Sequence, residues 1–244
     1  MSDDPTGGRP TDGRPAAAHR VIRTADGSAS VYAEGFGAAY HSTHGALQES
    51  QHVFVQAGLA HLARARHEVA LLECGFGTGL NYFASAAYAL AHGLRLDYTG
   101  IEAHPLRASL LAETGYDRLA ELAPLAGLTP KLIPAVHAAP WPSDLGVDGL
   151  GVLRKRPSAI EELDADAAYD LLYYDAFAPG AQPELWTPTV FARLYRALRP
   201  GGVLTTYCVQ GQVRRDLRSV GFEVVKLPGP PGKREMTRAR RPSP

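Results

Sequence analysis

The chain has 244 residues, enough for one sizeable α/β domain and too few for two full-sized ones. Hydrophobic residues make up 45% of it, and no apolar run reaches the roughly 18 residues that a membrane-spanning helix needs, so we expect no membrane contact. Basic and acidic residues are equal in number, which excludes a surface that is basic throughout. The two cysteines each follow an apolar run, which indicates buried free thiols in a reducing, cytoplasmic compartment.

The charge is unevenly distributed along the chain. From Thr205 to Pro244 there are nine Lys or Arg residues and three acidic ones, so this end carries about +6 and the remainder about −6. A local contact with a polyanion and a solvated basic tail explain this imbalance equally well.

Composition divides the chain into three parts. Residues 1–18 are dominated by Gly, Pro, Asp, Arg and Ala and predict a flexible leader, and residues 240–244 predict a flexible tail. Residues 19–239 predict one domain. It consists of an N-terminal extension, 19–66, and a core, 67–239.

Strand-like and helix-like runs alternate along the core. The first, Val69–Cys74, is a continuous apolar run followed by Gly, as expected for a strand buried on both faces. The later predicted strands are Leu96–Glu102, Tyr169–Asp175, Val203–Tyr207 and Phe222–Leu227. The predicted helices are Leu80–Ala91, Pro105–Ala123, Ser158–Leu163, Thr187–Leu198 and Gln210–Val220, with a loop-rich stretch over 124–149. This alternation predicts an α/β fold with a doubly wound, mostly parallel sheet.

A glycine-rich loop, GFGTGLN, follows the first strand directly. Its glycines, Gly75, Gly77 and Gly79, would let a ligand approach the bare main chain at the start of a helix. A nicotinamide fingerprint would need a third glycine where Leu80 stands. The acid just before the loop, Glu73, instead favours S-adenosylmethionine, whose ammonium group Glu73 could pair directly or through water. A purely structural glycine turn is the alternative, which the strand–acid–glycine–helix context disfavours.

Two further residues belong to this predicted cofactor site. Asn81 is the last residue of the glycine loop, and we expect it to bind the cofactor. Glu102 ends the second strand, where a carboxylate can accept hydrogen bonds from both ribose hydroxyls of a nucleoside. A solvated strand-end acid is the alternative for Glu102 when it is considered without the loop.

The segment YDAFAPGAQPELW carries the strongest candidate for catalysis. Asp175 lies at the predicted carboxyl end of a strand, where open α/β sheets gather their ligands. Phe177 could line an aromatic slot for a planar base, and Pro179 stiffens the chain beside it. We expect Trp186 to be mainly structural.

These blocks together resemble the MnmC/MnmD group of tRNA wobble-uridine methyltransferases, over about Tyr32–Met236. Six segments match in the same order: AYHSTHGALQESQHVF, LLECGFGTGLNYF, GIEAHPL, DAFAPGAQPELWT, TYCVQGQVRRDLRSVGFEV and GPPGKREM. The resemblance implies a Rossmann-like class I methyltransferase with an N-terminal extension. It further implies methyl transfer from S-adenosylmethionine to the primary amine of 5-aminomethyl-uridine, or its 2-thio form, at the wobble position.

The resemblance also implies roles for particular residues. Asp175 is the expected catalytic residue. Tyr40, Ser42 and Glu49 lie in the first of these six segments, Ala39–Phe54, which we call the entry segment. They could cover the cofactor, although a packed N-terminal extension explains them nearly as well. The family usually has Gly-Asp-Ala before the short helix, where the Asp contacts adenine, and here Ser158 takes its place. The chain also departs from the family after Pro179, where Gly-Ala-Gln replaces a commoner Lys-Asn pair, and over residues 124–152, which look lengthened.

A tRNA partner would be bound mainly through its phosphates. The expected contacts are Arg214, Arg215, Lys233 and Arg234, together with the tail arginines.

No metal is expected, because the three histidines of the entry segment, His41, His44 and His52, do not have metal-ligand spacing. No flavin is expected either, since the oxidase domain attached in some family members would need far more chain.

Three other functions stay open at this point. One is methyl transfer to a small-molecule amine, with the basic tail incidental. Another is a catalytically silent module that binds cofactor or RNA. A nicotinamide-dependent oxidoreductase is a weaker third because of Leu80. The sequence makes no prediction of oligomeric state.

Overall fold

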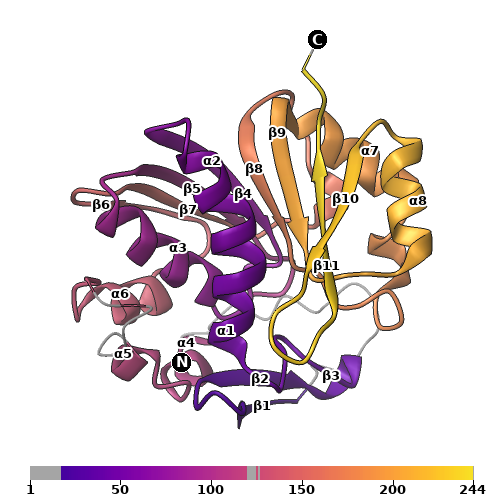
Figure 1. Cartoon of the computed structure of the whole chain (residues 1–244). Helices are drawn as coiled ribbons and strands as arrows, with labels where there is room; N and C mark the ends of the chain where they lie inside the picture. The colour runs from indigo at the N-terminus through magenta and orange to yellow at the C-terminus, as the bar shows by residue number, and fades with distance from the viewer. Residues whose placement is uncertain (1–17, 120–124, 126, 244) are drawn as a thin grey trace, which may run out of the picture.

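The structure, a computed structural model, describes residues 18–119, 125 and 127–243; the predicted leader therefore lies outside the described residues except for Ala18. An eight-stranded sheet has the order β10-β11-β9-β8-β4-β5-β7-β6, and a three-stranded sheet the order β1-β2-β3 (Figure 1). The large sheet consists of β4 Glu68–Cys74, β5 Arg95–Ile101, β6 Ser143–Val147, β7 Gly151–Arg156, β8 Tyr169–Tyr174, β9 Leu198–Thr206, β10 Glu223–Pro228 and β11 Glu235–Arg240. The small one consists of β1 His19–Arg23, β2 Ala29–Ala33 and β3 Ala38–Ala39.

The centre of the large sheet is parallel and its two margins are antiparallel. Strand β4 pairs in parallel with β5 and β8, and these pair in parallel with β7 and β9. The β6–β7 hairpin closes one margin, and β11 inserts antiparallel between β9 and β10 at the other. The predicted mostly parallel sheet is confirmed.

Helices lie on both faces of the large sheet. The helices of the described residues are η1 Glu34–Phe36, α1 Ala46–Glu49, η2 Ser50–Leu59, α2 Ala60–Ala63, α3 Leu80–Ala91, α4 Ala108–Ala112, α5 Tyr116–Leu119, α6 Leu132–Ala138, η4 Ile160–Glu162, η5 Pro183–Leu185, α7 Pro188–Ala197 and α8 Gly211–Ser219. In Figure 1, α1, α2 and α3 lie in front of the central strands, whereas α7 and α8 lie on the side of β9 and β10. The fold is therefore doubly wound, as predicted.

Side chains of the central strands point alternately to the two faces of the sheet, and this explains why the molecule has a hydrophobic core on each face. Leu71 and Tyr173 belong to the core shared with η2 and α3, whereas Leu72 and Leu172 belong to the core shared with α7 and α8. Successive side chains of a strand point to opposite faces, so a strand with helices on both sides is mainly apolar along its length. The VALLEC and YDLLYY runs have this composition, apart from the buried acids Glu73 and Asp170.

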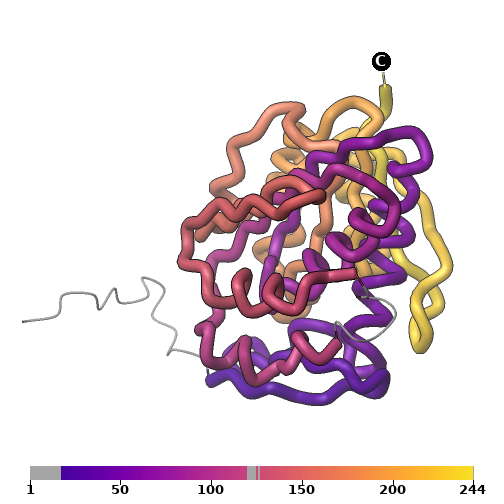
Figure 2. The backbone as a smooth tube through the Cα atoms, turned by 90° about the vertical axis from the view of Figure 1, so that its left-hand side faces the viewer, coloured from indigo at the N-terminus to yellow at the C-terminus, as the bar shows by residue number. Residues whose placement is uncertain are grey.

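The N-terminal extension contains strands and a long helical segment that are not predicted from the sequence. It forms the small antiparallel sheet and a continuous helical segment, α1–η2–α2, which packs on α3 and β9. The small sheet lies across the lower end of the molecule, near the loop between β10 and β11 (Figures 1 and 2). Contact between Gly232 of that loop and His44 of the extension agrees with this view.

Three predicted stretches differ from the structure. The helix expected over Pro105–Ala123 is two short helices, α4 and α5, because Gly115 adopts a φ of +66° between them; residues 120–123 lie outside the described residues. The loop-rich stretch contains α6 and strand β6, with β7 just after it. Strand β11 extends to Arg240, the first residue of the predicted tail.

A buried carboxylate joins three strands at their amino-terminal ends. Asp170, whose side chain is 2% exposed, accepts hydrogen bonds from Arg66 at 2.8 Å, Arg199 at 2.9 Å and the backbone N–H of Ala70 at 3.0 Å. Burial without such partners would be costly for a charged group. Asp170 therefore links the starts of β4, β8 and β9.

We predict that Asp170→Ala lowers the free energy of unfolding by about 1–3 kcal/mol, because a backbone donor and two arginines lose a buried acceptor. Urea denaturation measures this change. The matched control is Asp164→Ala, which also removes an arginine partner, here of Arg196, but at a side chain that is 89% exposed. Equal losses in the two variants would contradict the assignment.

Candidate active site

The central strands bring the predicted site residues to one edge of the sheet. Because β4 lies between β5 and β8, its end at Cys74 is level with Ile101 on one side and Tyr174 on the other. The glycine loop, Glu102 and Asp175 follow these three strand ends directly. Parallel strands thus place at one edge three groups that are distant in sequence.

The glycine loop has the backbone conformation that requires glycine. Gly75, Gly77 and Gly79 have φ values of +92°, +51° and +78°. A Cβ atom at Gly75 would lie 2.7 Å from the carbonyl oxygen of Asp175, and one at Gly77 would lie 2.8 Å from the ring of Tyr40. Both the dihedral angles and the close approach of neighbouring atoms exclude larger residues.

A chain of buried hydrogen bonds connects the loop to the catalytic candidate. Asn81 Nδ2 donates to Glu73 Oε1 and to Asp175 Oδ2, both at 2.8 Å, and Tyr98 Oη donates to Glu73 Oε2 at 2.7 Å. Glu73 is fully buried, and this burial raises its pKa well above the usual value. Glu73 therefore lies behind Asn81 and holds its side chain, and both of its carboxylate oxygens are already bonded, to Asn81 and to Tyr98.

Asn81 keeps one acceptor unused. Its Oδ1 atom is buried and has no hydrogen-bond partner among the described residues. Unpaired buried acceptors are uncommon, so this one is suited to a donor that arrives with a ligand. The ammonium group of S-adenosylmethionine is such a donor, and in this respect the site fits that cofactor.

The Asp175 carboxyl lies in a low-dielectric, partly negative environment. Burial raises its pKa to about 8, and the nearby Glu49 carboxylate adds to the increase, whereas Asn81 and Lys233 oppose it. A raised pKa is frequent for carboxyls that exchange protons in active sites.

Glu102 contacts the glycine loop itself. Its Oε2 atom accepts a hydrogen bond from the Gly77 N–H at 3.0 Å, and Oε1 accepts one from the His104 N–H at 3.0 Å. The carboxylate is thus fixed at the loop, next to where a bound nucleoside would lie. Its contact with ribose stays a prediction.

The entry segment reaches this edge of the sheet. The Tyr40 ring covers Gly77 and makes an edge contact with Phe177, at 4.9 Å between ring centroids. The Phe36 ring also stacks on Phe177, at 4.6 Å between ring centroids. Burial raises the pKa of Tyr40, so its hydroxyl stays neutral. These rings form an aromatic cluster over the loop, and Phe36 was not predicted because it lies outside every recognisable motif.

Two further residues of the entry segment form an inward-facing polar pair. The Ser42 N–H donates to Glu49 Oε2 at 2.7 Å, and Glu49 is only 5% exposed. Glu49 Oε1 forms an ion pair with Lys233. Because Lys233 turns inward to this carboxylate, it is not free for the phosphate contact expected from the sequence.

Arg214 also departs from its predicted role. It is 4% exposed, and its guanidinium donates to Thr237 Oγ1 at 3.0 Å, to Glu235 Oε2 at 2.8 Å and to the Met236 carbonyl at 3.4 Å. These bonds anchor α8 to β11, so Arg214 is structural. Arg215 and Arg234 are exposed, as a phosphate contact requires.

The remaining predicted residues have local contacts. Ser158 Oγ donates to the Ala159 carbonyl and to Glu162 Oε2, both at 3.2 Å, and so caps the turn after β7. Pro179 lies partly buried in the turn after Phe177. Trp186 is buried against Tyr174 and donates to the Phe177 carbonyl at 2.7 Å, which supports its structural assignment.

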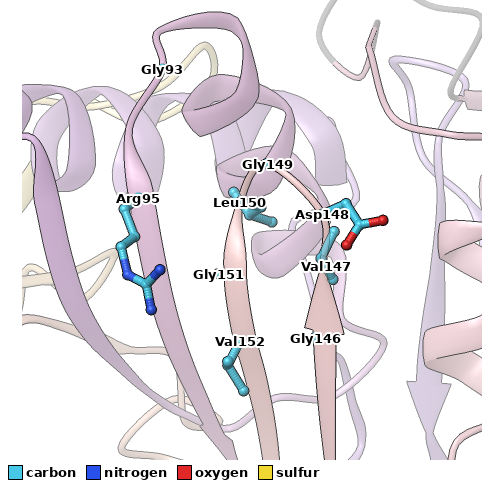
Figure 3. A pocket seen from close by; sticks show the side chains of 9 residues that line it. All are labelled: Gly93, Arg95, Gly146, Val147, Asp148, Gly149, Leu150, Gly151 and Val152. Atoms are coloured by element: carbon cyan, nitrogen blue, oxygen red, sulfur yellow. The ribbon is translucent and has the colours of Figure 1, made fainter.

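A separate depression lies at the other end of the sheet. It has a volume of about 560 Å³ and is formed by the β6–β7 hairpin and the start of β5 (Figure 3). Its lining consists of Gly93, Arg95 and residues 146–152. Because it lies at the amino-terminal end of β5, it is remote from the strand ends that carry Glu102 and Asp175.

The described residues show neither a metal-ligand cluster nor a membrane-spanning helix. No three His, Cys, Asp or Glu side chains within residues 18–119, 125 and 127–243 are grouped as a metal ion would need. In the same part of the chain, no helix has the length and apolar character for crossing a membrane. Cys74 and Cys208 are both buried free thiols.

Known proteins share this architecture. The crystal structure of MNMC2 from Aquifex aeolicus matches with a TM-score of 0.69 and 24% identity, covering 93% of this chain and 72% of that one. Spermidine synthase from Thermotoga maritima matches with a TM-score of 0.54 and 12% identity, covering 91% and 67%. Residues 153–242 match a family described as S-adenosyl-L-methionine-dependent methyltransferase. The fold is that of the class I S-adenosylmethionine-dependent methyltransferases.

Sequence comparison narrows this class. The bifunctional MnmC protein of tRNA 5-methylaminomethyl-2-thiouridine biosynthesis from Azoarcus sp. (strain BH72) is 37% identical over 222 residues, covering 86% of this chain and 34% of that protein. Its counterpart from Ralstonia nicotianae is 38% identical over 212 residues, covering 84% and 32%. The chain is a homologue of the MnmC proteins. It spans about a third of the length of these curated relatives.

We predict that Gly75→Ala weakens S-adenosylmethionine binding at least tenfold and destabilises the fold by about 1–3 kcal/mol, because the new methyl group meets the Asp175 backbone at a positive φ. Isothermal titration calorimetry and urea denaturation measure the two effects. Gly146→Ala serves as control, since a Cβ there would meet no atom within 4 Å. Wild-type affinity in the Gly75→Ala variant would show that the loop does not hold the cofactor.

Proposed function

We propose that this chain transfers a methyl group from S-adenosylmethionine to the primary amine of 5-aminomethyl-uridine, or its 2-thio form, at the wobble position of tRNA. The product named for the MnmC relatives is a 5-methylaminomethyl-2-thiouridine, in which an aminomethyl nitrogen carries a methyl group. A methyltransferase fold supplies that N-methylation step. The observation that carries the proposal is the Glu73–Asn81–Asp175 chain beside the glycine loop.

Two residues would bind the cofactor at its opposite ends. Asn81 Oδ1 would accept a hydrogen bond from the ammonium group, and Glu102 would accept hydrogen bonds from the ribose. When bound, the cofactor supplies an electrophilic methyl group on a sulfonium. Ser158, after β7, is proposed to contact the adenine, and the Phe36, Tyr40 and Phe177 rings to pack beside the uracil base.

Asp175 would orient the acceptor amine and receive its proton. An alkylammonium with a pKa of ~10.4 lies about 3.4 units above neutral pH, so its deprotonation costs roughly 4.6 kcal/mol. Enclosure by protein and the nearby sulfonium charge both lower that pKa. Asp175, as an anion, would stabilise the ammonium and can act as a base only when it is unprotonated. Its main contribution is therefore to hold the nitrogen lone pair in line with the methyl group.

We assign only the methyl-transfer step to this chain. The second activity of the bifunctional relatives, and any flavin, are not assigned to it. We also propose a cytoplasmic site of action, which the two free buried thiols support. Methylation of a small-molecule amine is less favoured, because the curated relatives are named for tRNA modification.

We predict that Asp175→Ala abolishes methyl transfer while S-adenosylmethionine binding survives. Nucleoside mass analysis of wobble uridines, after incubation of aminomethylated tRNA with protein and cofactor, measures the transfer, and calorimetry measures the binding. Asp148→Ala, at an exposed residue, is the control. Near wild-type turnover in the Asp175→Ala variant would overturn the catalytic assignment.

We further predict different outcomes for the arginines near the C-terminus. Arg215→Ala and Arg234→Ala should each weaken tRNA binding and reduce its salt slope by about 1, because each removes one phosphate contact. Arg214→Ala should instead lower stability, since its guanidinium anchors α8 to β11. Filter binding at several salt concentrations, together with thermal denaturation, separates the two effects. An unchanged salt slope in both exposed-arginine variants would place the tRNA elsewhere.

A further inference from the structure

Lys233 lies at the catalytic edge of the sheet although it belongs to the far end of the sequence. The loop between β10 and β11 carries it down to the N-terminal extension (Figure 1). Its Nζ atom pairs with Glu49 Oε1, across 184 residues of sequence, and lies 4.8 Å from the ring centroid of Tyr207. Cation–π contact and ion pairing both fix the position of this ammonium group.

The Glu49–Lys233 pair is electrically coupled to Asp175. Glu49 raises the pKa of the Asp175 carboxyl and Lys233 lowers it, so the two charges act in opposite directions on one group. Tyr207 adds a physical link, because its hydroxyl donates to the carbonyl of Ala176, the residue after Asp175, at 2.7 Å. One end of the pair comes from α1 and the other from the β10–β11 loop.

We propose that Glu49 and Lys233 are positioning residues of the methyl-acceptor site, whose ion pair sets the charge that faces Asp175 and thereby keeps its carboxylate able to receive the proton of the acceptor amine. This inference rests on the proposed function. It replaces the two sequence-based roles, in which Glu49 covers the cofactor and Lys233 contacts phosphate.

The chemistry of the acceptor explains why such a pair is useful. A primary alkylammonium entering beside Asp175 would meet two carboxylates, Glu49 and Asp175, and both would stabilise its charged, unreactive form. Lys233 neutralises the charge of Glu49, which leaves Asp175 as the carboxyl that interacts with the acceptor. A second ammonium group close by also disfavours the protonated state of the acceptor.

Other polar and titratable groups lie in the surroundings of Asp175. They come from each element packed against it: Asn81 on α3, Glu73 and Cys74 on β4, Tyr98 on β5, Tyr207 and Cys208 after β9, and Tyr40 and His41 in the entry segment. Burial raises the pKa values of the tyrosines and cysteines and lowers that of His41 to about 4, so these groups are neutral near pH 7. Glu49 and Lys233 are therefore the charges that substitution can change without breaking the Asn81 bonds.

A simple structural clamp predicts a different pattern from the proposed one. If the pair only joined α1 to the β10–β11 loop, loss of either partner would remove the same contact and have the same effect on Asp175. If the pair sets charge, Lys233→Met removes a cation, whereas Glu49→Gln removes an anion. The two single variants should then shift Asp175 in opposite directions.

The test is a ¹³C NMR titration of the aspartate side-chain carboxyls in the full chain, with the Asp175 signal assigned by its absence in Asp175→Asn. In the wild-type protein we expect the Asp175 carboxyl to titrate with a midpoint near pH 8. Lys233→Met should raise it by about one pH unit and Glu49→Gln should lower it by about one, with the double variant between them. Lys233→Arg should retain the wild-type midpoint, and so should Lys226→Met, which breaks an exposed pair with Glu235.

Shifts in the same direction for both single variants, or no shift in either, would overturn the proposal. Circular dichroism and thermal denaturation identify a variant that fails to fold. If Lys233→Met fails, Glu49→Gln still gives the sign, with Lys233→Arg as the unshifted reference. Because the titration needs no tRNA, it is independent of the proposed function. If the wild-type protein transfers no methyl group to tRNA, the proposed function is contradicted. If the acidic limb of the kcat–pH profile shifts in opposite directions in the two variants, both the proposed function and the positioning role are supported.

Discussion

The candidate site depends on one carboxamide held between two carboxylates. Asn81 donates through a single nitrogen to Glu73 and to Asp175, and so links the end of β4, the start of α3 and the end of β8. Two buried acids this close would repel each other if both were ionised. The burial-raised pKa values of Glu73 and Asp175 indicate that proton uptake relieves this repulsion in the free protein. The same bonds aim the unpaired Asn81 oxygen away from both acids, which makes it an acceptor for a cationic ligand.

Two segments from opposite ends of the chain complete the site around this core. The N-terminal extension contributes Phe36, Tyr40 and Glu49, and the β10–β11 loop contributes Lys233. Neither segment belongs to the parallel centre of the sheet. The sheet therefore fixes the cofactor loop and Asp175, whereas the acceptor side depends on how the two ends of the chain meet.

The parallel core and its strand-end acids could be predicted from the sequence because their signals are local. Apolar runs followed by glycine or an acid mark β4, β5 and β8, and the helix over Leu80–Ala91 has the predicted bounds. The small N-terminal sheet and the β6–β7 hairpin could not be predicted. Their strands are short and weakly alternating, and they are stabilised by packing against distant elements.

The side-chain roles for which the structure favours a different assignment are those that depend on tertiary partners. A basic residue in an amphipathic helix or a charged loop is usually solvated, and nothing local distinguishes Arg214 or Lys233 from Arg215. Only the fold shows that Glu235 and Thr237 enclose Arg214 and that Glu49 captures Lys233. For the same reason, Glu73 could be recognised as a site acid, but its position behind Asn81 could not.

The most direct test of the site is an experimental structure of the chain with S-adenosylhomocysteine bound. The account predicts that the ligand ammonium contacts Asn81 Oδ1, that the ribose lies at Glu102, and that the sulfur faces the Asp175 carboxylate. A ligand bound away from the glycine loop, or an Asp175 side chain directed away from the sulfur, would contradict it.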